Sequence, residues 1–362
     1  ECWKRDTLLL QLIDSVLIRS NDIKIGFLEV AMQKADFGYQ RGLRKPTVSG
    51  LIQPSLRRFG KYTMDAVGNY DTKFSTNITK EQIIPENLPD FQVGLQSSWE
   101  LDIWGKIRRS TEAARAELLS TFYAKRGVEL SLISEVASNY FNLLDYKARL
   151  DISEKTFASR DSALTIIELR YEKGIIPLID VNQAQVQRSI AQAAIPQFKR
   201  LIAQSEHNIS VLLGKNPDRI LTDSDLLNQN IPDSIPVGIP SQLLNRRPDI
   251  AQYEQLYRAQ NARIGVAQAM RFPSISLTGL LGVGSTDLSN LVSNGLGWSA
   301  GASLVGPLFE WGKNIRRVDI ERERANQALL AYEFSVINAL REVQDALVEI
   351  QTYQEELLAR AE

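Results

Sequence analysis

Residues that usually perform catalysis or bind metals are scarce in this sequence. Its 362 residues include one histidine, His207, and one cysteine, Cys2. A single cysteine permits neither an internal disulfide nor a cysteine-rich metal site, and one histidine cannot form a histidine cluster. We interpret His207 as a polar position on a helix. No Ser/His/Asp set, phosphate-binding glycine loop or carboxylate cluster is present as a motif, so we expect no enzyme, no cofactor and no bound metal.

Charge and hydropathy exclude further classes. The 42 basic and 43 acidic residues give a net charge of -1, and no polybasic segment indicates a nucleic-acid partner. No run of 18 or more apolar residues is available for a transmembrane helix. No signal peptide is visible at Glu1-Cys2-Trp3. We therefore expect either an intracellular protein or a chain that begins downstream of its export signal.

The stretch Trp99 to Glu117 changes from one periodicity to another. Alternate apolar positions of a strand run through Phe91, Val93, Leu95, Ser97, Trp99, Leu101 and Ile103. Trp104-Gly105 ends this alternation, and an Ala/Glu/Arg-rich run of high helix propensity follows. Trp311-Gly312 repeats the transition after a second strand-like segment. We predict two direct strand-to-helix junctions, at Trp104-Gly105 and at Trp311-Gly312.

Long helices are predicted between the strands. Residues 7–45 have apolar residues seven apart and are expected to form one helix ended by Pro46. A second helix covers 108–171, and its seven-residue spine is Val136, Leu143, Leu150, Phe157, Leu164 and Tyr171. A repeat of seven sustained this long indicates helices packed side by side as a coiled coil. Gly174 and Pro177 predict a tight turn into a returning helix, which Pro196 should kink.

Four amphipathic strands are predicted in two hairpins. Their apolar faces include Val48 to Leu56, Phe91 to Ile103, Ile275 to Val283 and Trp298 to Leu304. The segment 57–90 is polar and is expected to form a long loop. Gly282 and Gly284 indicate a strand without bulk on one face. A further helix from 241 to Arg271 precedes the third strand, and the last helix begins at Trp311.

The two halves of the sequence are a tandem repeat. An offset of 207 residues aligns Trp104-Gly105 with Trp311-Gly312, and an offset of 227 aligns Pro46 with Pro273. We divide the chain into a first repeat, 1–213, a connector, 214–240, and a second repeat, 241–362. The first contains hairpin 46–104 and helical hairpin 105–213; the second contains hairpin 273–311 and an outgoing helix. No counterpart of 156–213 follows, so we expect the second repeat to be incomplete.

Four strands cannot close a membrane barrel, because an open sheet leaves backbone groups unpaired in lipid. Two chains would supply eight strands and three would supply twelve. Faces rich in Val, Ile, Leu and Trp opposite Ser, Thr and Gln favour a lipid-facing wall around water. The strands could otherwise be edge hairpins of a soluble domain.

Several motifs in combination resemble the outer-membrane factor (TolC/OprM-like) family of tripartite efflux channels. They are ELDIWGKIRRSTEAARAE, YEKGIIPLIDVNQAQ, LLGKNP, LLNRRPDI, RFPSISLTG and GPLFEWGKNIRRVDIERERANQALLAYEFSVINALREVQDAL. The resemblance implies an α+β membrane protein, with a transmembrane β-barrel built by trimerisation from four strands per chain and a long coiled-coil α-helical barrel. It also implies the Gram-negative outer membrane as location, with extension into the periplasm. The implied partners are outer-membrane lipid, a periplasmic adaptor and an inner-membrane transporter.

The resemblance further implies site residues. The family's periplasmic tip motif falls on Tyr171, Gly174, Asp180, Val181 and Gln185, and Ile175 and Ile176 are expected as exposed apolar contacts for the adaptor. An ordinary helical-hairpin turn explains Gly174 and Pro177 equally well. Relatives close the channel with residues of the second helical hairpin, so no gate residue is named. Many members carry a lipidated N-terminal cysteine, but Cys2 does not fit that role because the segment after it resembles the interior of the mature chain.

Three functions remain open at this stage. The first is passive efflux of drugs, metal ions or other small solutes through the outer membrane. The second is a protein-secretion duct of the same fold. The third, from a different class, is a coiled-coil scaffold or adhesin that conducts nothing.

Overall fold

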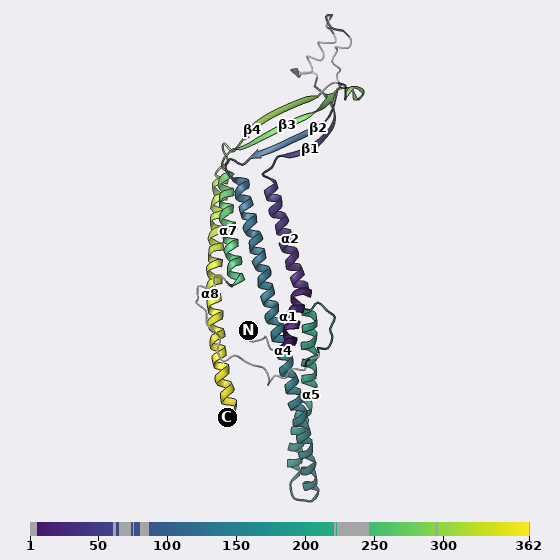
Figure 1. Ribbon diagram of the computed structural model, residues 1–362, viewed down its shortest axis with the longest axis vertical. Helices are drawn as coiled ribbons and strands as arrows, with labels where there is room; N and C mark the ends of the chain where they lie inside the picture. The colour runs from purple at the N-terminus through teal and green to yellow at the C-terminus, as the bar shows by residue number, and fades with distance from the viewer. Residues whose placement is uncertain are drawn as a thin grey trace. The chain divides into compact units, whose positions relative to one another are not determined.

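The computed structural model describes residues 6–60, 63–64, 74, 76–79, 87–220, 222, 246–293 and 296–361. Long helices and one antiparallel sheet make up these residues, which confirms the predicted α+β composition (Figure 1). Two compact units divide the chain. The helical unit comprises Glu1–Gln33, Leu118–Gln255 and Ala331–Glu362, and the sheet unit comprises Lys34–Glu117 and Leu256–Leu330.

The core of the helical unit is an apolar cluster from three helices. They are α1 (Thr7–Arg19), α4 (Lys106–Glu172) and α5 (Leu178–Leu212), with a contribution from the start of α2 (Asn21–Gly42). Tyr140 is fully buried in this cluster, and its hydroxyl donates a 2.6 Å hydrogen bond to the carboxylate of Asp6. Asp6 also accepts from the Leu8 and Leu9 N–H groups and so caps α1. One carboxylate therefore connects the start of α1 to the middle of α4.

The predicted single helix over 7–45 is wrong in one respect, because it is two helices that meet at Ser20. The Ser20 backbone is extended, with ψ of 139°, and its hydroxyl accepts a 3.3 Å hydrogen bond from the Asp22 N–H. A serine that bonds to the second N–H of the next helix is an N-cap. Leu9, Val16 and Ile23 are nevertheless all buried in the same core.

The seven-residue spine of α4 changes in burial along its length. Val136 and Leu143 are fully buried, Leu164 is 8% exposed, and Tyr171 at the end of the helix is exposed. The returning α5 contributes Ile209 to the core, and the Ser205 hydroxyl donates to the Asn139 carbonyl oxygen. α5 continues on both sides of Pro196. The side-by-side packing predicted from the heptads is thus present over the inner part of the hairpin.

The sheet unit contains a four-stranded antiparallel sheet with strand order β1-β2-β3-β4. Its strands are β1 (Thr47–Arg58), β2 (Asn87–Leu101), β3 (Ser274–Ser285) and β4 (Gly297–Val305), and the short 3-10 helix η4 (Leu288–Asn290) lies in the second loop. The predicted loop over 57–90 is wrong at both ends, because Arg57 pairs with Leu88 and Arg58 with Asn87. Backbone pairing extends beyond the alternation of side chains that marked the strands.

The register of the sheet separates two faces, since directly opposite residues of antiparallel strands point the same way. One face, called the apolar face here, consists of Val48, Gly50, Ile52, Pro54, Leu56, Pro89, Phe91, Val93, Leu95, Ser97, Trp99, Leu101, Ile275, Leu277, Gly279, Leu281, Val283, Ser285, Trp298, Ala300, Ala302 and Leu304. The opposite polar face consists mostly of Ser, Thr, Gln and Gly. Many side chains of the apolar face, such as Ile52 and Trp298, are exposed.

Two glycines bring β2 and β3 close together on the polar face. Gly94 and Gly282 are directly opposite each other. A Cβ atom on Gly94 would lie 2.5 Å from the Leu281 carbonyl oxygen, and one on Gly282 would lie 2.4 Å from the Val93 carbonyl oxygen. Glycine pairs of this kind allow a sheet to curve sharply. The absence of bulk predicted at Gly282 is confirmed and has this close approach as its reason.

The remaining helices join the strands. α7 (Pro248–Ala269) precedes β3, and its predicted start at 241 lies outside the described residues as far as 245. α8 (Lys313–Ala361) follows β4 and begins two residues later than predicted. No helix in the described residues is both long enough and apolar enough to cross a membrane, which agrees with the sequence.

Candidate functional site

The turn between α4 and α5, called the tip here, has a defined C-cap geometry. Gly174 has φ of +69°, its N–H donates to the Tyr171 carbonyl oxygen, and the Ile175 N–H donates to that of Arg170. These two bonds form a Schellman motif, which requires a left-handed residue at the position of Gly174. Pro177 then precedes α5 as its N-cap rather than as its first residue. The sequence therefore encodes a sharp reversal at the tip.

Apolar side chains at the tip face outward. Ile175 is 70% exposed, Tyr171 is also exposed, and Ile176 and Asp180 are half-buried. Ile176 and Asp180 line an open cavity of about 810 Å³ between α4 and α5. Further exposed apolar side chains on the two helices are Ile166, Leu169, Leu178, Ile179, Val186 and Ile190. The predicted contact residues thus lie in and beside the turn, and Ile176 and Asp180 share one cavity.

An ion pair connects the two helices of the hairpin. Arg188 of α5 bonds to the carboxylate of Asp161 on α4, and its guanidinium lies 5.1 Å from the centre of the Phe157 ring. Gln192 accepts a further bond from the Arg188 guanidinium. The contacts of Arg188 with Asp161 and Phe157 lie across the hairpin, at the part of the spine where burial is incomplete, whereas the bond to Gln192 lies within α5. The two contacts across the hairpin hold α4 and α5 together close to the tip.

The first strand-to-helix junction is tightly bonded. Asp102 accepts 2.8 Å hydrogen bonds from the N–H groups of Ile107 and Arg108 and caps α4. Gly105 turns the chain with φ of +78°. The Trp104 indole N–H donates to the Pro273 carbonyl oxygen at 2.7 Å, and its ring stacks on Phe272 at a centroid distance of 4.6 Å. Trp104 therefore links the end of β2 to the start of β3.

The second junction has the same turn but fewer contacts. Gly312 has φ of +77°, and Trp311 has φ of +51°, a conformation that is unusual for a residue with a large side chain. Trp311 contacts Phe309 edge to face and is 88% exposed. Within the described residues its indole N–H has no hydrogen-bond acceptor. The two tryptophans predicted to be equivalent thus differ in their surroundings.

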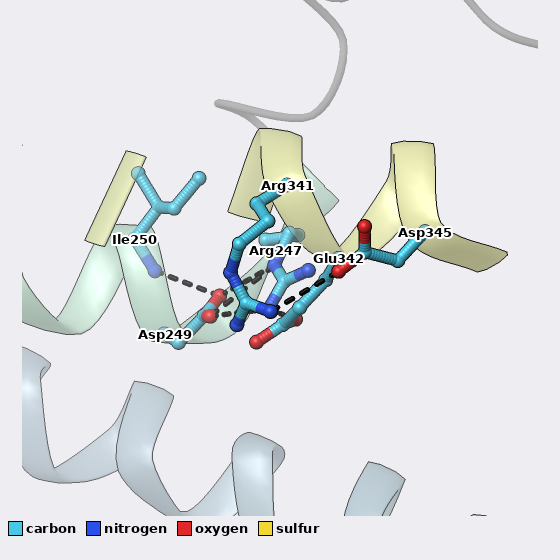
Figure 2. A network of polar contacts seen from close by, with 6 residues as sticks. All are labelled: Arg247, Asp249, Ile250, Arg341, Glu342 and Asp345. Atoms are coloured by element: carbon cyan, nitrogen blue, oxygen red, sulfur yellow. Dashed lines mark hydrogen bonds and ion pairs between the residues drawn. The ribbon is translucent and has the colours of Figure 1, made fainter. Parts of the chain in front are cut away.

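A polar network joins the start of α7 to α8 in the helical unit (Figure 2). The Arg247 guanidinium bonds to Asp249 and to Glu342, each at 2.6 Å. Asp249 in turn accepts a 2.9 Å hydrogen bond from the Ile250 N–H. On α8, Arg341, the residue before Glu342, pairs with Asp345 at 3.1 Å. Arg247 thereby bonds to a residue that lies 95 positions away in the sequence.

Sequence reasoning missed this network, although LLNRRPDI was recognised as a family motif. The hydrogen bond with Asp249 raises the pKa of Arg247 above its ordinary value, against the opposing effect of burial. Burial acts to raise the pKa of Asp249, but bonds from Arg247 and the Ile250 N–H outweigh it, so that pKa lies below its ordinary value. Glu342 could have been found through the repeat, because it is the counterpart of Glu135. No other signal connects it to Arg247.

Comparison with known proteins identifies the family. A sequence model of the family described as outer membrane efflux protein matches residues 13–215 and 239–362. The chain belongs to this family. It is 32% identical over 359 residues to the solvent efflux pump outer membrane protein SrpC of Pseudomonas putida, covering 99% of this chain and 73% of SrpC. It is 31% identical over 353 residues to the cation efflux system protein CusC of Escherichia coli K12, covering 96% of this chain and 72% of CusC.

Solved structures of this kind have the same fold. The outer-membrane channel OprN superimposes with a TM-score of 0.87 at 27% identity, covering 99% of this chain and 78% of OprN. The open state of the MtrE outer membrane channel from Neisseria gonorrhoeae gives a TM-score of 0.81 at 25% identity, covering 95% and 73%. The family is one of efflux channels. Among the described residues, no group of three or more His, Cys, Asp and Glu side chains could hold a metal ion.

Proposed function

We propose that this protein is the outer-membrane channel of a tripartite efflux system and passively conducts drugs, metal ions or other small solutes to the cell exterior. The observation that carries the proposal is the four-stranded sheet. It has one apolar and one polar face, and its strands continue directly into long helices. Membership of the outer membrane efflux protein family supports the same function.

Strand length supports a membrane location for the sheet. A tilted strand needs about 9–11 residues to cross a bilayer. The two outer strands have 12 and 9 residues, for β1 and β4 respectively. On the apolar face, Ile52 is 80% exposed and Trp298 is 76% exposed. Lipid is the environment in which such side chains are stable when no protein covers them.

The edges of this sheet support the proposed assembly as a homotrimer. Within the part of the chain that the structure describes, β1 and β4 each pair with one strand, so each leaves a row of backbone groups open. Lipid does not tolerate open edges, and a closed barrel removes them. The antiparallel order of an even number of strands lets β4 of one copy meet β1 of the next as an antiparallel pair. Three copies supply twelve strands, a number within the range of outer-membrane barrels.

The tip is the proposed contact for a periplasmic adaptor, which connects the channel to an inner-membrane transporter. Tyr171, Gly174, Ile175, Ile176 and Asp180 supply the surface. Exposed apolar side chains such as Ile175 on a rigid Schellman turn are suited to a protein partner, because little conformational entropy is lost on binding. The names of SrpC and CusC refer to a solvent pump and a cation system, which supports small solutes as cargo.

Composition of the polar face supports weak selection by charge in the barrel. Charged residues on this face lie toward the strand ends, at Arg57, Asp90 and Glu100, and Glu100 is paired with Lys106. Gln, Ser, Thr, Leu and Gly occupy the rows between them. Charge selectivity in pores arises from rings of charged side chains. We therefore expect the barrel to pass cations and anions with similar permeability.

Conductance of the purified protein in planar lipid bilayers tests the proposal. A channel gives stepwise currents, whereas a scaffold or adhesin gives none. Efflux is tested by comparing the accumulation of a fluorescent drug in cells that lack the protein and in cells that express it. Lower accumulation in the expressing cells supports efflux. Currents without any change in drug accumulation would instead favour a protein-secretion duct.

A further inference from the structure

The two hairpins of the sheet have the same register when compared through the internal repeat. Thr47 of β1 is opposite Ser98 of β2. Adding the two repeat offsets, 227 residues for β1 and 207 for β2, gives Ser274 and Val305, which are opposite each other in β3 and β4. The offsets therefore relate the strands residue by residue. β3 is the structural counterpart of β1, and β4 is the counterpart of β2.

This correspondence predicts what the open edge of β4 should meet. β2 pairs on its other side with β3, so β4 should pair on its other side with a strand equivalent to β3. That strand is β1, and because β1 of the same chain lies at the far edge of the sheet, it must come from a second copy. In the β2–β3 pairing, Ser98 is opposite Thr278 and Ser97 is opposite Gly279. Adding 207 to each β2 residue and subtracting 227 from each β3 residue converts these into two pairs between copies. These are Val305 with Leu51 and Leu304 with Ile52.

The translated register keeps the two faces of the sheet continuous. Ile52 and Leu304 both belong to the apolar face, and Leu51 and Val305 both belong to the polar face. A slip by one residue would place each side chain opposite one of the other face. Ile52, Leu304 and Val305 are exposed in the single chain, so these positions are free to pair.

The junction tryptophans give an independent indication of the same contact. Trp104 follows β2 and donates to the carbonyl oxygen of Pro273, at the start of the adjacent β3. Trp311 follows β4, and the counterpart of Pro273 is Pro46, at the start of β1. The Trp311 indole is 88% exposed and lacks an acceptor within the described residues. Lys45 occupies the position of Phe272, so a cation–π contact would replace the ring stacking.

We propose that β4 pairs with β1 of a neighbouring copy with Val305 opposite Leu51, and that the Trp311 indole N–H donates to the Pro46 carbonyl oxygen of that copy. This inference rests on the oligomeric channel proposed above. It assigns an acceptor to an exposed donor and gives the register of the interface. The second copy thereby completes at Trp311 the junction that a single chain completes at Trp104.

Disulfide crosslinking tests the register. In a Cys2→Ser background, one variant carries Leu51→Cys with Val305→Cys and another carries Ile52→Cys with Leu304→Cys. Consecutive antiparallel pairs alternate between hydrogen-bonded and non-hydrogen-bonded geometry, so one of the two pairs has the closer approach that a disulfide needs. The control, Gln53→Cys with Val305→Cys, represents a slip of two residues. After oxidation, we expect at least one predicted pair to give a larger fraction of covalently linked oligomers than the control.

Native mass measured in parallel separates the two proposals. An oligomer that crosslinks only in the control, or in none of the variants, would overturn the register and leave the channel proposal in place. A monomeric mass under all conditions would overturn the oligomeric assembly itself, and the register with it. A crosslinked oligomer in the predicted pairs supports both.

Trp311→Phe tests the second part of the inference, since it removes the N–H donor and retains an aromatic ring. A neutral hydrogen bond of this kind corresponds to about a five-fold change in association per interface. We expect the oligomer of the variant to dissociate at lower urea concentration in detergent than the parent. Phe309→Leu changes the neighbouring ring and leaves the donor, so it serves as the control. Equal dissociation of Trp311→Phe and the parent would overturn the contact.

Discussion

The guanidinium of Arg247, just before α7, lies 2.6 Å from the carboxylate of Glu342 on α8. The same guanidinium bonds to Asp249, which accepts a hydrogen bond from the Ile250 N–H in the first turn of α7. Arg247 thus joins the start of one helix to the side of another within the helical unit. Its side chain is 25% exposed, so solvent screens the network only in part.

Replacement of Glu342 by Gln should weaken this connection modestly. The Glu342 side chain is half exposed, and ion pairs of this exposure contribute less than about 1 kcal/mol. We expect a correspondingly small decrease in the free energy of unfolding of the helical unit, measured by urea titration followed by circular dichroism. Arg247→Gln should cost more, about 1–2 kcal/mol, because Asp249 also loses its partner. Glu349→Gln, on an exposed site of the same helix, should have no effect; an equal loss there would contradict the role of Glu342.

Acidification should remove the contribution of Asp249. Its pKa is lowered in the folded protein, so the stabilisation is complete above the unfolded value of about 3.9 and disappears as the pH falls through the folded value. The difference in unfolding free energy between the parent and Asp249→Asn should therefore be largest near neutral pH and shrink below about pH 4. Urea titrations at several pH values measure it. A difference that grows with acidification would contradict a lowered pKa of Asp249 in the folded protein.

Strand periodicity could be predicted from the sequence because each strand has a different environment on its two sides. Val48, Ile52 and Leu56 alternate with polar residues, and all three lie on the apolar face. The ends of the strands could not be predicted in this way. Arg58 and Asn87 belong to strands because their backbones pair, although these polar residues fall at positions of the apolar face and so end the alternation.

The break at Ser20 and the network at Arg247 show two other limits of sequence reasoning. Leu9, Val16 and Ile23 continue one seven-residue pattern across Ser20, so hydrophobic periodicity could not reveal two helices. The serine followed by Asn21 and Asp22 was an available N-cap signal. The partner of Arg247 lies far away in the sequence, and only the packing of α7 against α8 brings Glu342 to it.

Substitution of Gly94 by Ala should disturb the sheet. The added Cβ would lie 2.5 Å from the Leu281 carbonyl oxygen and 2.8 Å from the Gly282 Cα, both backbone atoms that cannot move independently. Overpacking of this kind costs about 1–3 kcal/mol. We expect a lower thermal stability of the sheet in detergent, measured by far-ultraviolet circular dichroism. Gly50→Ala is a matched control, because a Cβ there meets nothing within 4 Å. Equal stability of the two variants would show that the close approach of β2 and β3 is not required.

Introduction of a charge at Ile175 tests the proposed adaptor contact. Ile175 is 70% exposed and its N–H, rather than its side chain, takes part in the Schellman turn, so Ile175→Glu should leave the helical hairpin folded. Burial of an unpaired carboxylate against an apolar partner should weaken adaptor binding at least about tenfold. We expect cells carrying the variant to accumulate a fluorescent drug as cells without the channel do, while conductance in bilayers is retained. Val211→Glu, an equally exposed apolar position near the other end of α5, is the control. Normal efflux by Ile175→Glu, or the same defect in Val211→Glu, would remove Ile175 from the proposed contact surface.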